Sequence, residues 1–534
     1  MRARRHAALL FIWLLLLSCA AANAAKKSQK VESKGSGLAD EINKILSQPD
    51  IARGYWGIEV DSLTTGKVLY SLNEDKLFTP ASNTKLFTTA ATMALIGSDY
   101  RFRTTVETSG AVDKYGRVNG DLMLVGRGDP NISGRNLPYS VRTQRTLPPM
   151  QVLQQLADQV VKRGVKFVDG DVIGDDSYFA FERYGEGWAQ DDMVWEWGAP
   201  VSALTINDNV VYVNILPADH PGDRAFVDIT PYAEYYRVDN RIMTTPAGTG
   251  PRRVYITREP GGNELTMWGN IPIDDPGATE ALAIEDPAAF AAKVFRQMLE
   301  QRGVVIYGRT RTKHTELASL STFTVTASAP ANGGGGDVQS RPPAVPMTLV
   351  LASYESQPLA EDLRVINKVS QNLHAELMLR LLGREKGTGG TVQAGLEVVR
   401  GFLTQAGISP DQFVFYDGSG LSRQNLVTPH AIVLLLKYAD SQVWGPKFID
   451  TLPVAGVDGS LADRMKDSPA QGRVQGKTGA LGHVSTLSGY LTTLSGDRVV
   501  FSIMANNFNV QSKRSTESID QIVNAIVTYG AKKH

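Results

Sequence analysis

Apolar side chains in the first hundred residues follow helical spacing in some segments and strand-like patterns in others. They recur at helical spacing over residues 38–46, whereas residues 55–62 and 67–72 carry the β-branched and aromatic side chains typical of strands. The turn Thr64-Thr65-Gly66 between the two strand segments predicts a hairpin. The apolar stretch over residues 85–96 predicts a second helix.

The pattern changes between residues 101 and 345. Short β-rich segments alternate there with turns rich in Gly, Asp and Pro: 103–108, 121–125 and 210–215. Helical spacing is found over residues 150–162 and 287–301. The stretch 329–346, rich in glycine and proline, is predicted to be a linker or an exposed loop.

The last third of the chain is rich in helical patterns. Four segments have helical spacing: 359–367, 372–382, 392–406 and 429–439. Two strand segments and a closing helix follow them: 485–493, 498–505 and 515–527. Because strands near both ends enclose helices, we predict one α+β domain, formed by residues 38–100 and 346–534, with residues 101–345 as a β-rich insertion.

The N-terminus has the order of a secretory signal. Three arginines precede an apolar run over residues 7–17, and Ala22-Asn23-Ala24 fits the small-x-small site of signal peptidase. We therefore expect residues 1–24 to be removed on export and residues 25–37 to form a flexible lead-in. A retained membrane anchor is the weaker alternative, because spanning a bilayer takes about 20 apolar residues.

Cys19 is the only cysteine, and it lies inside the predicted signal. The mature chain would therefore contain no disulfide, no thiol nucleophile and no Cys-ligated metal. Lipid anchoring at Cys19 is an alternative, because residues 16–19 loosely resemble a lipoprotein cleavage box. Leu17 is not the small residue usual in such a box, so a free product is preferred.

Composition sets broad limits on the class of protein. A chain of 534 residues with 42% hydrophobic residues is expected to form two or three globular domains. Lys and Arg together number 55, as do Asp and Glu, so the charge balance does not suggest a nucleic-acid partner. The seven histidines show no paired spacing suited to a metal, and we expect none.

The first candidate for chemistry is Ser82-Asn83-Thr84-Lys85. Residues three apart share one face of a helix, so the Lys85 amine can reach the Ser82 hydroxyl. A desolvated lysine with a lowered pKa can take the proton of a serine and make it a nucleophile. Taken alone, the pattern also fits a serine cap followed by a solvated lysine.

Two further tripeptides complete the candidate site. In Ser370-Gln371-Asn372, the Ser370 hydroxyl could relay a proton, and the Asn372 amide could both donate and accept hydrogen bonds. In Lys477-Thr478-Gly479, the lysine and threonine offer a cation and a hydroxyl to a substrate carboxylate, and the glycine leaves room for a substrate backbone. Alone, each tripeptide also fits an ordinary loop or turn.

The order of the three motifs carries more information than any one of them. Ser-x-x-Lys, Ser-x-Asn and Lys-Thr-Gly, in this order, are the signature of penicillin-binding proteins and active-site serine β-lactamases, which this sequence resembles. The runs 367–376 and 417–423 resemble those of class C low-molecular-mass penicillin-binding proteins, the D-alanyl-D-alanine carboxypeptidase/endopeptidases. The long separation of Ser82 from Ser370 agrees, because that family carries a large insertion between these motifs.

The resemblance implies a fold and a periplasmic location. It predicts a serine β-lactamase/transpeptidase-like domain, an antiparallel sheet with helices, interrupted by two smaller β-rich domains. The substrates would be peptidoglycan stem peptides ending in D-Ala-D-Ala, and their cross-links. β-Lactams would be covalent inhibitors, no cofactor would be needed, and a weak association with membrane or cell wall is allowed.

The resemblance also implies a role for each motif residue. Ser82 would be acylated with Lys85 as base, and Ser370 would pass a proton to the departing amine in a catalytic group that includes Asn372. Lys477 and Thr478 would hold the substrate carboxylate beside Gly479. The backbone N–H groups of Ser82 and Ala480 would form the oxyanion hole, although family members often carry Thr or Ser where this chain has Ala480.

Two other functions remain open from the sequence. A serine β-lactamase shares the acylation step but must also hydrolyse the penicilloyl-enzyme rapidly, and no glutamate-bearing loop of the kind found in class A enzymes is evident. A peptidoglycan-binding protein without turnover is the second alternative, although all the motif side chains are present. His374 and His483 lie close in sequence to Ser370 and Lys477, and for both a core or capping role is favoured over a supporting role in the site.

Overall fold

The computed structural model describes residues 37–140, 145–320 and 348–531. The predicted signal peptide, Cys19 and the glycine-rich stretch 329–346 lie outside these residues. Within the described residues, no helix is long and apolar enough to cross a membrane.

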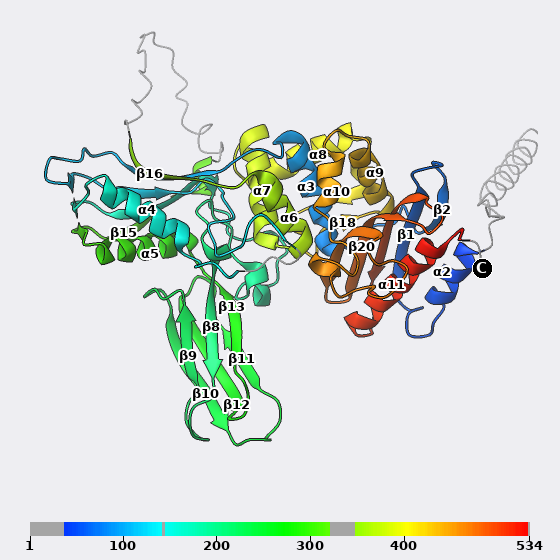
Figure 1. The fold of residues 1–534 in the computed structure, drawn as a ribbon, viewed down its shortest axis with the longest axis horizontal. Coiled ribbons are helices and arrows are strands. Elements are labelled where there is room, and N and C mark those ends of the chain that lie inside the picture. The colour runs from blue at the N-terminus through cyan, green and yellow to red at the C-terminus, as the bar shows by residue number, and fades with distance from the viewer. Residues whose placement is uncertain (1–36, 141–144, 321–347, 532–534) are drawn as a thin grey trace, which may run out of the picture.

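A five-stranded antiparallel sheet joins the two ends of the chain (Figure 1). In spatial order its strands are β19 (Val474–Leu481), β20 (Val484–Thr492), β21 (Arg498–Asn506), β1 (Tyr55–Ser62) and β2 (Val68–Leu72). Because β1 pairs with β21 along its whole length, the N-terminal hairpin completes a sheet begun by the C-terminal strands. The predicted α+β domain, interrupted by an insertion, is therefore confirmed.

The two faces of the sheet pack against different helices, as alternating side chains dictate. Along β21, Phe501 and Ile503 belong to the apolar core under α2 (Leu38–Leu46) and α11 (Ser512–Thr528). Val500, one position along, lies in the core on the opposite face. Successive side chains of β21 thus enter two different apolar cores, and each core is covered by its own set of helices.

The opposite face carries the helices that surround the candidate site. They are α3 (Thr84–Leu95), α6 (Leu359–Val369), α7 (Asn372–Lys386), α8 (Val392–Gln405), α9 (Pro429–Asp440) and α10 (Gly445–Asp450). Every residue of α3 from Thr84 to Met93 is buried. A helix buried on all sides belongs in the middle of a domain, and α3 lies against α6, α7, α8 and α9.

The insertion begins with a second five-stranded sheet, in the order β15-β7-β5-β3-β16. Its elements are β3 (Arg103–Thr108), β5 (Leu122–Val125), β7 (Val172–Ala180), β15 (Thr310–Thr315), β16 (Leu349–Glu355), α4 (Gln151–Lys162) and α5 (Pro287–Gln301). A small sheet of β4 (Arg117–Val118), β6 (Phe167–Val168) and β14 (Val305–Ile306) adjoins it. Since β16 pairs with β3, the inserted sheet extends past the boundary expected at residues 345–346.

The rest of the insertion is an arm of two three-stranded sheets that projects from the body (Figure 1). One contains β8 (Val210–Leu216), β9 (Phe226–Thr230) and β13 (Ala278–Ala283), and the other contains β10 (Arg237–Thr245), β11 (Arg253–Thr257) and β12 (Glu264–Pro272). β10 and β12 pair in parallel over nine residues each. Strand patterns do not indicate which strands pair, so the sequence predicted β content here but not this arrangement.

Short elements connect these layers. They are the two-stranded sheet β17 (Phe413–Val414) and β18 (Leu426–Val427) and the 3₁₀ turns η1 (Ala81–Asn83), η2 (Gln190–Asp192), η3 (Glu196–Gly198), η4 (Asn207–Asn209), η5 (Leu317–Leu320), η7 (Pro410–Gln412) and η8 (Gly459–Leu461). Four of these turns, η1, η3, η4 and η8, are part of the site or contact it.

Candidate active site

Ser82 lies in the 3₁₀ turn η1, which leads directly into α3, rather than on the helix itself as the sequence suggested. Ala81 has a positive φ of 48°, which turns the chain sharply ahead of the serine. The sheet holds the turn in place: Thr486 Oγ1 donates to the Pro80 carbonyl at 3.0 Å, and Asn83 Nδ2 donates to Ser488 Oγ at 2.8 Å. The partly exposed Ser82 side chain is therefore fixed at the start of a buried helix.

Lys85 lies on the first turn of α3 and is fully buried. Its Nζ lies 2.9 Å from Ser82 Oγ, and it donates to Asn372 Oδ1 and to the Ser419 carbonyl, each at 2.6 Å. The i, i+3 spacing thus brings the amine to the hydroxyl as the sequence predicted. Two carbonyl oxygens from distant parts of the chain fix the amine there.

Burial lowers the pKa of Lys85 to about 7. Moving an ammonium ion out of water disfavours its charged form, which is the main cause. The carboxylates of Asp417 and Glu376 act in the opposite direction and limit the fall. Near neutral pH the amine is therefore divided between its charged and neutral forms.

Ser370 and Asn372 lie where α6 ends and α7 begins. Ser370 adopts a left-handed conformation with φ 68° and ψ 34°, which ends α6. Asn372 begins α7 and uses both ends of its amide: Oδ1 accepts from Lys85, and Nδ2 donates to the Trp197 carbonyl at 2.8 Å. The second motif therefore directly contacts the first.

Lys477 links the third motif to the second. Its buried Nζ donates to Ser370 Oγ and to the Thr478 carbonyl, each at 2.9 Å. Desolvation lowers the pKa of Lys477, and the positive charge of Lys85 lowers it further. The three motifs thus form one continuous cluster around two buried amines.

Thr478, Gly479 and Ala480 follow on β19, at the edge of the sheet. Thr478 Oγ1 lies 2.6 Å from Ser460 Oγ, so two hydroxyls meet beside the cluster. A Cβ at Gly479 would lie 2.3 Å from Thr486 Oγ1, 2.8 Å from the Pro80 oxygen and 3.0 Å from the Ser82 nitrogen. This glycine therefore also makes room for the serine turn of the protein itself, a reason that the sequence did not indicate.

The assembled site can be compared with known proteins. The sequence matches the D-Ala-D-Ala carboxypeptidase 3 (S13) family over residues 38–332 and 337–528. The chain belongs to this family. It is 35% identical over 515 residues to a D-alanyl-D-alanine carboxypeptidase of Actinomadura sp. (strain R39), which covers 94% of this chain and 87% of that relative.

Two other relatives agree with this assignment. Penicillin-sensitive carboxypeptidase A of Dictyostelium discoideum is 28% identical over 492 residues, covering 88% of this chain and 86% of its own. Penicillin binding protein 4 of Haemophilus influenzae has the same fold, with a TM-score of 0.73 at 22% identity over 91% of this chain and 98% of that one. The predicted class, a serine D-alanyl-D-alanine carboxypeptidase of the penicillin-binding type, is confirmed.

The S13 carboxypeptidase also uses a loop to which the sequence gave no role. Asp417 accepts hydrogen bonds from the N–H groups of Gly420 at 2.8 Å and Ser422 at 2.7 Å, which folds residues 417–422 into a tight loop. At Gly420, which has a φ of 83°, a Cβ would lie 1.9 Å from the Ala81 oxygen. This loop presents the Ser419 carbonyl to Lys85, and its glycine-rich run was the signal that could have indicated a close backbone approach.

The insertion of the S13 carboxypeptidase reaches the same cluster. Trp188 Nε1 donates to Asp417 Oδ2 at 2.9 Å, in addition to the bond between Asn372 and the Trp197 carbonyl. Asp208 of η4 lies 3.2 Å from His374 Nε2 and forms ion pairs with Arg135 and Arg145. The sequence showed no motif in the insertion, because single residues that act across domains leave no local pattern.

The two histidines near the motifs have different surroundings. His374 is fully buried beneath the second motif, and desolvation lowers its pKa although Asp208 opposes that change. Its contact with Asp208 links α7 to η4 of the insertion. His483 lies in the turn after β19, where Nδ1 is 2.7 Å from the Phe508 carbonyl. His483 therefore stabilises a turn outside the cluster, as the favoured interpretation expected.

Proposed function

We propose that this S13 carboxypeptidase cleaves both D-Ala-D-Ala termini and the peptide cross-links of peptidoglycan, through an acyl-enzyme on Ser82. The observation that carries the proposal is the position of Lys85 Nζ, 2.9 Å from Ser82 Oγ, with its pKa lowered to about 7. A nucleophile within hydrogen-bond distance of a base that is partly neutral at working pH is what covalent hydrolysis requires.

The two other contacts of Lys85 support its role as the base. A neutral amine has two N–H bonds and one lone pair. The Asn372 side chain and the Ser419 carbonyl both lie 2.6 Å from Nζ and can accept the two N–H groups. The lone pair then points to the remaining partner, and the Ser82 O–H donates to it. Proton transfer to Lys85 leaves the Ser82 oxygen free to attack the substrate carbonyl.

The second amine supports the later steps of the proposal. As Ser82 attacks, the carbonyl of the penultimate residue becomes a tetrahedral oxyanion, which the N–H groups of Ser82 and Ala480 stabilise; one such donor is typically worth about 3–4 kcal/mol. Ser370 passes its hydroxyl proton to the departing amine and takes a replacement from Lys477, whose Nζ donates to Ser370 Oγ at 2.9 Å. Thr478 and the neighbouring Ser460 offer hydroxyls to the substrate carboxylate beside the Lys477 amine, and the bound carboxylate favours the charged form of that amine.

The same intermediate accounts for both substrates and for β-lactam inhibition. Water attacks the acyl carbonyl and gives a proton back to Lys477 by way of Ser370. The Ser82–acyl bond breaks, Ser82 regains the proton held by Lys85, and the shortened peptide acid leaves. When the departing amine is free D-alanine the reaction is that of a carboxypeptidase, and when it belongs to a neighbouring stem peptide it is that of an endopeptidase. A β-lactam acylates Ser82 in the same way, but its opened ring stays attached.

The N-terminal sequence pattern supports a proposal about where in the cell this reaction occurs. We propose export through residues 1–24 and action in the periplasm, where peptidoglycan is found. Mass spectrometry of the protein isolated from the cell envelope would find a new N-terminus at residue 25. An intact N-terminus, or an acylated Cys19, would contradict free export.

Purified cell wall provides the test of the activity. Digestion by the enzyme should release D-alanine and convert cross-linked dimers to monomers, as read by mass spectrometry of the fragments. Ser82→Ala and Lys85→Ala should abolish both products. Release of D-alanine with dimers unchanged would remove the endopeptidase part of the proposal. Retained release of both by Ser82→Ala would remove the mechanism.

A further inference from the structure

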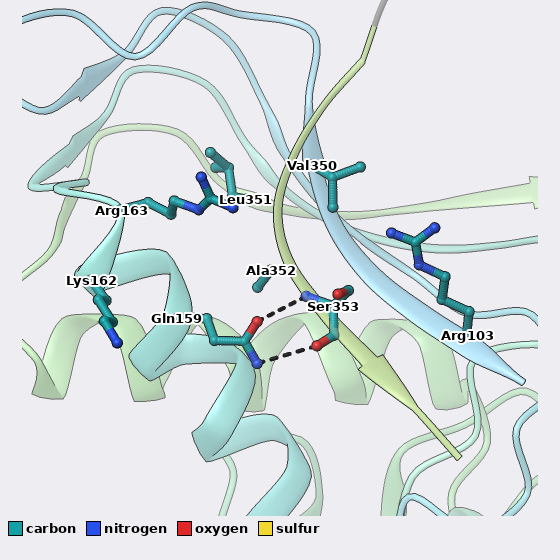
Figure 2. Close-up of a pocket in the computed structure, with 8 residues that line it drawn as sticks. All are labelled: Arg103, Gln159, Lys162, Arg163, Val350, Leu351, Ala352 and Ser353. Atoms are coloured by element: carbon teal, nitrogen blue, oxygen red, sulfur yellow. Dashed lines mark hydrogen bonds between the residues drawn. The ribbon is translucent and has the colours of Figure 1, made fainter.

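The insertion carries a groove between α4 and β16, the edge strand of its larger sheet. The groove has a volume of about 550 Å³ and is lined by Arg103, Lys162 and Arg163 together with Gln159 and residues 350–353. Figure 2 shows Arg103 and Arg163 on either side of β16. This groove is separate from the cluster around Ser82 and shares no lining residue with it.

The basic residues of the groove are not engaged in ion pairs with the rest of the protein that the structure describes. Among the described residues, Arg103, Lys162 and Arg163 form no ion pair and no side-chain hydrogen bond. The acids on the surrounding elements are paired with other arginines. Asp158 of α4 pairs with Arg302 at 2.6 Å, and Glu107 of β3 pairs with Arg127 at 2.8 Å. Glu355 of β16 lies opposite Arg103 in the strand register but pairs with Arg101 at 3.7 Å. Three basic residues therefore line one groove, and none of them forms an ion pair among the described residues, in a chain whose total charge is balanced.

The floor of the groove is preformed. Leu351 and Ala352 are buried beneath it. The Gln159 amide donates to the Ser353 carbonyl at 3.2 Å and accepts from the Ser353 N–H at 3.0 Å, as the dashed lines in Figure 2 show. This pair of bonds ties α4 to the edge strand and keeps the walls at a fixed separation. A preformed groove binds a ligand without first having to be ordered.

We propose that this groove binds the carboxylates of an acidic peptide, and specifically the stem peptides of peptidoglycan other than the one in the catalytic site. Guanidinium groups match carboxylates with two parallel hydrogen bonds, and the volume suits a short peptide segment. Binding there would hold the polymer near Ser82 and raise the local substrate concentration. The identity of the peptide rests on the proposed function, whereas the charge of the groove does not.

Charge reversal in the full chain tests the groove. Lys162→Glu/Arg163→Glu and Arg103→Gln would be compared with Lys67→Glu/Lys513→Glu, a control pair of exposed lysines outside the groove that also lack an ion pair among the described residues. Cosedimentation with purified sacculi should weaken by about tenfold for the groove variants and lose its dependence on salt. The control pair should bind like the wild type.

Activity and alternative ligands separate the possible outcomes. Turnover of a soluble pentapeptide should stay within about twofold of wild type in the groove variants, because they leave the cluster around Ser82 unchanged. Binding would also be measured with Ser82→Ala protein, because that binding does not depend on turnover. A wild-type enzyme without turnover would then count against the proposed function and not against the groove. Wild-type binding of sacculi by the charge-reversed protein would overturn the proposal. It would also fall if sacculi stripped of stem peptides, or phosphatidylglycerol vesicles, bound with the same dependence on these residues.

Discussion

Two fully buried lysines share the active site, and their surroundings differ in charge. Lys85 lies within the fields of Asp417 and Glu376, which partly offset the effect of burial on its pKa. No carboxylate offsets the fall in the pKa of Lys477, and the positive charge of Lys85 lowers that pKa further. Because the pKa of Lys85 is lowered to about 7, this lysine can exchange a proton with Ser82 near neutral pH. Lys477 is placed instead to hold the Ser370 hydroxyl.

The pKa of Lys85 predicts how acylation depends on pH. A base works in its neutral form, which becomes the major form as the pH rises above the pKa. The rate of acylation by a β-lactam, followed by stopped-flow fluorescence, should therefore rise with pH, with a midpoint of about 7, and then level off. Lys85→Arg keeps its charge at every accessible pH and should slow acylation by about 10²–10⁴-fold. A wild-type rate that does not change through pH 7 would exclude Lys85 as the base.

At the scale of elements, α7 connects the motif at its N-terminus to the loop behind Lys85. Glu376, one turn after Asn372, accepts from the N–H groups of Gly418 at 2.9 Å and Ser419 at 2.8 Å. It also pairs with the buried Arg380 at 3.1 Å. One carboxylate therefore holds both the loop that carries the Ser419 carbonyl and a cation that has no access to water.

Glu376→Gln should destabilise the protein strongly. The amide oxygen can still accept from the loop, but Arg380 then keeps an unpaired charge at 1% side-chain exposure. Breaking such a pair costs about 3–5 kcal/mol, so the free energy of unfolding in urea should fall by that amount. Asp520→Asn is the control, because its pair with Arg464 is partly exposed, and it should cost about 1 kcal/mol or less. Equal losses for the two variants would contradict this account of α7.

Local signals explain which elements the sequence predicted well. The helices α5, α8 and α9 begin where Asp286, Thr391 and Thr428 accept a backbone hydrogen bond at their N-termini, and two of the three have proline in the first turn. Such caps depend on a few consecutive residues, so they can be recognised from the sequence. β19 was not among the strand segments given from the sequence, because Gly476 and Gly479 weaken its strand pattern.

At the scale of the whole molecule, the insertion and the catalytic domain form one site. Trp188, Trp197 and Asp208 reach the catalytic domain from segments more than a hundred residues away in the chain. The motifs could be predicted because their residue types and order are specific. These three contacts could not be predicted, since no spacing within the sequence relates residues of the insertion to the Asp417, Asn372 and His374 that they meet only after folding.

Trp188→Phe tests whether the insertion supports catalysis. The substitution keeps an aromatic ring but removes the N–H bond to Asp417, and a bond to a charged group is worth about 1.5–3 kcal/mol. Acylation by penicillin G should slow by about tenfold, which corresponds to about 1.4 kcal/mol. Trp56→Phe is the matched control, because Trp56 is also buried and also donates to an acceptor, the Ile51 carbonyl, away from the cluster. Equal rates in the two variants would show that the insertion does not act through Trp188.

The central claim is that Ser82 carries the acyl group. Incubation with penicillin G, digestion and tandem mass spectrometry would locate the covalent adduct within the chain. The account predicts a single modified residue, Ser82, and no adduct in Ser82→Ala protein that still folds. An adduct on another residue, or D-alanine release by Ser82→Ala protein that shows no adduct, would contradict it.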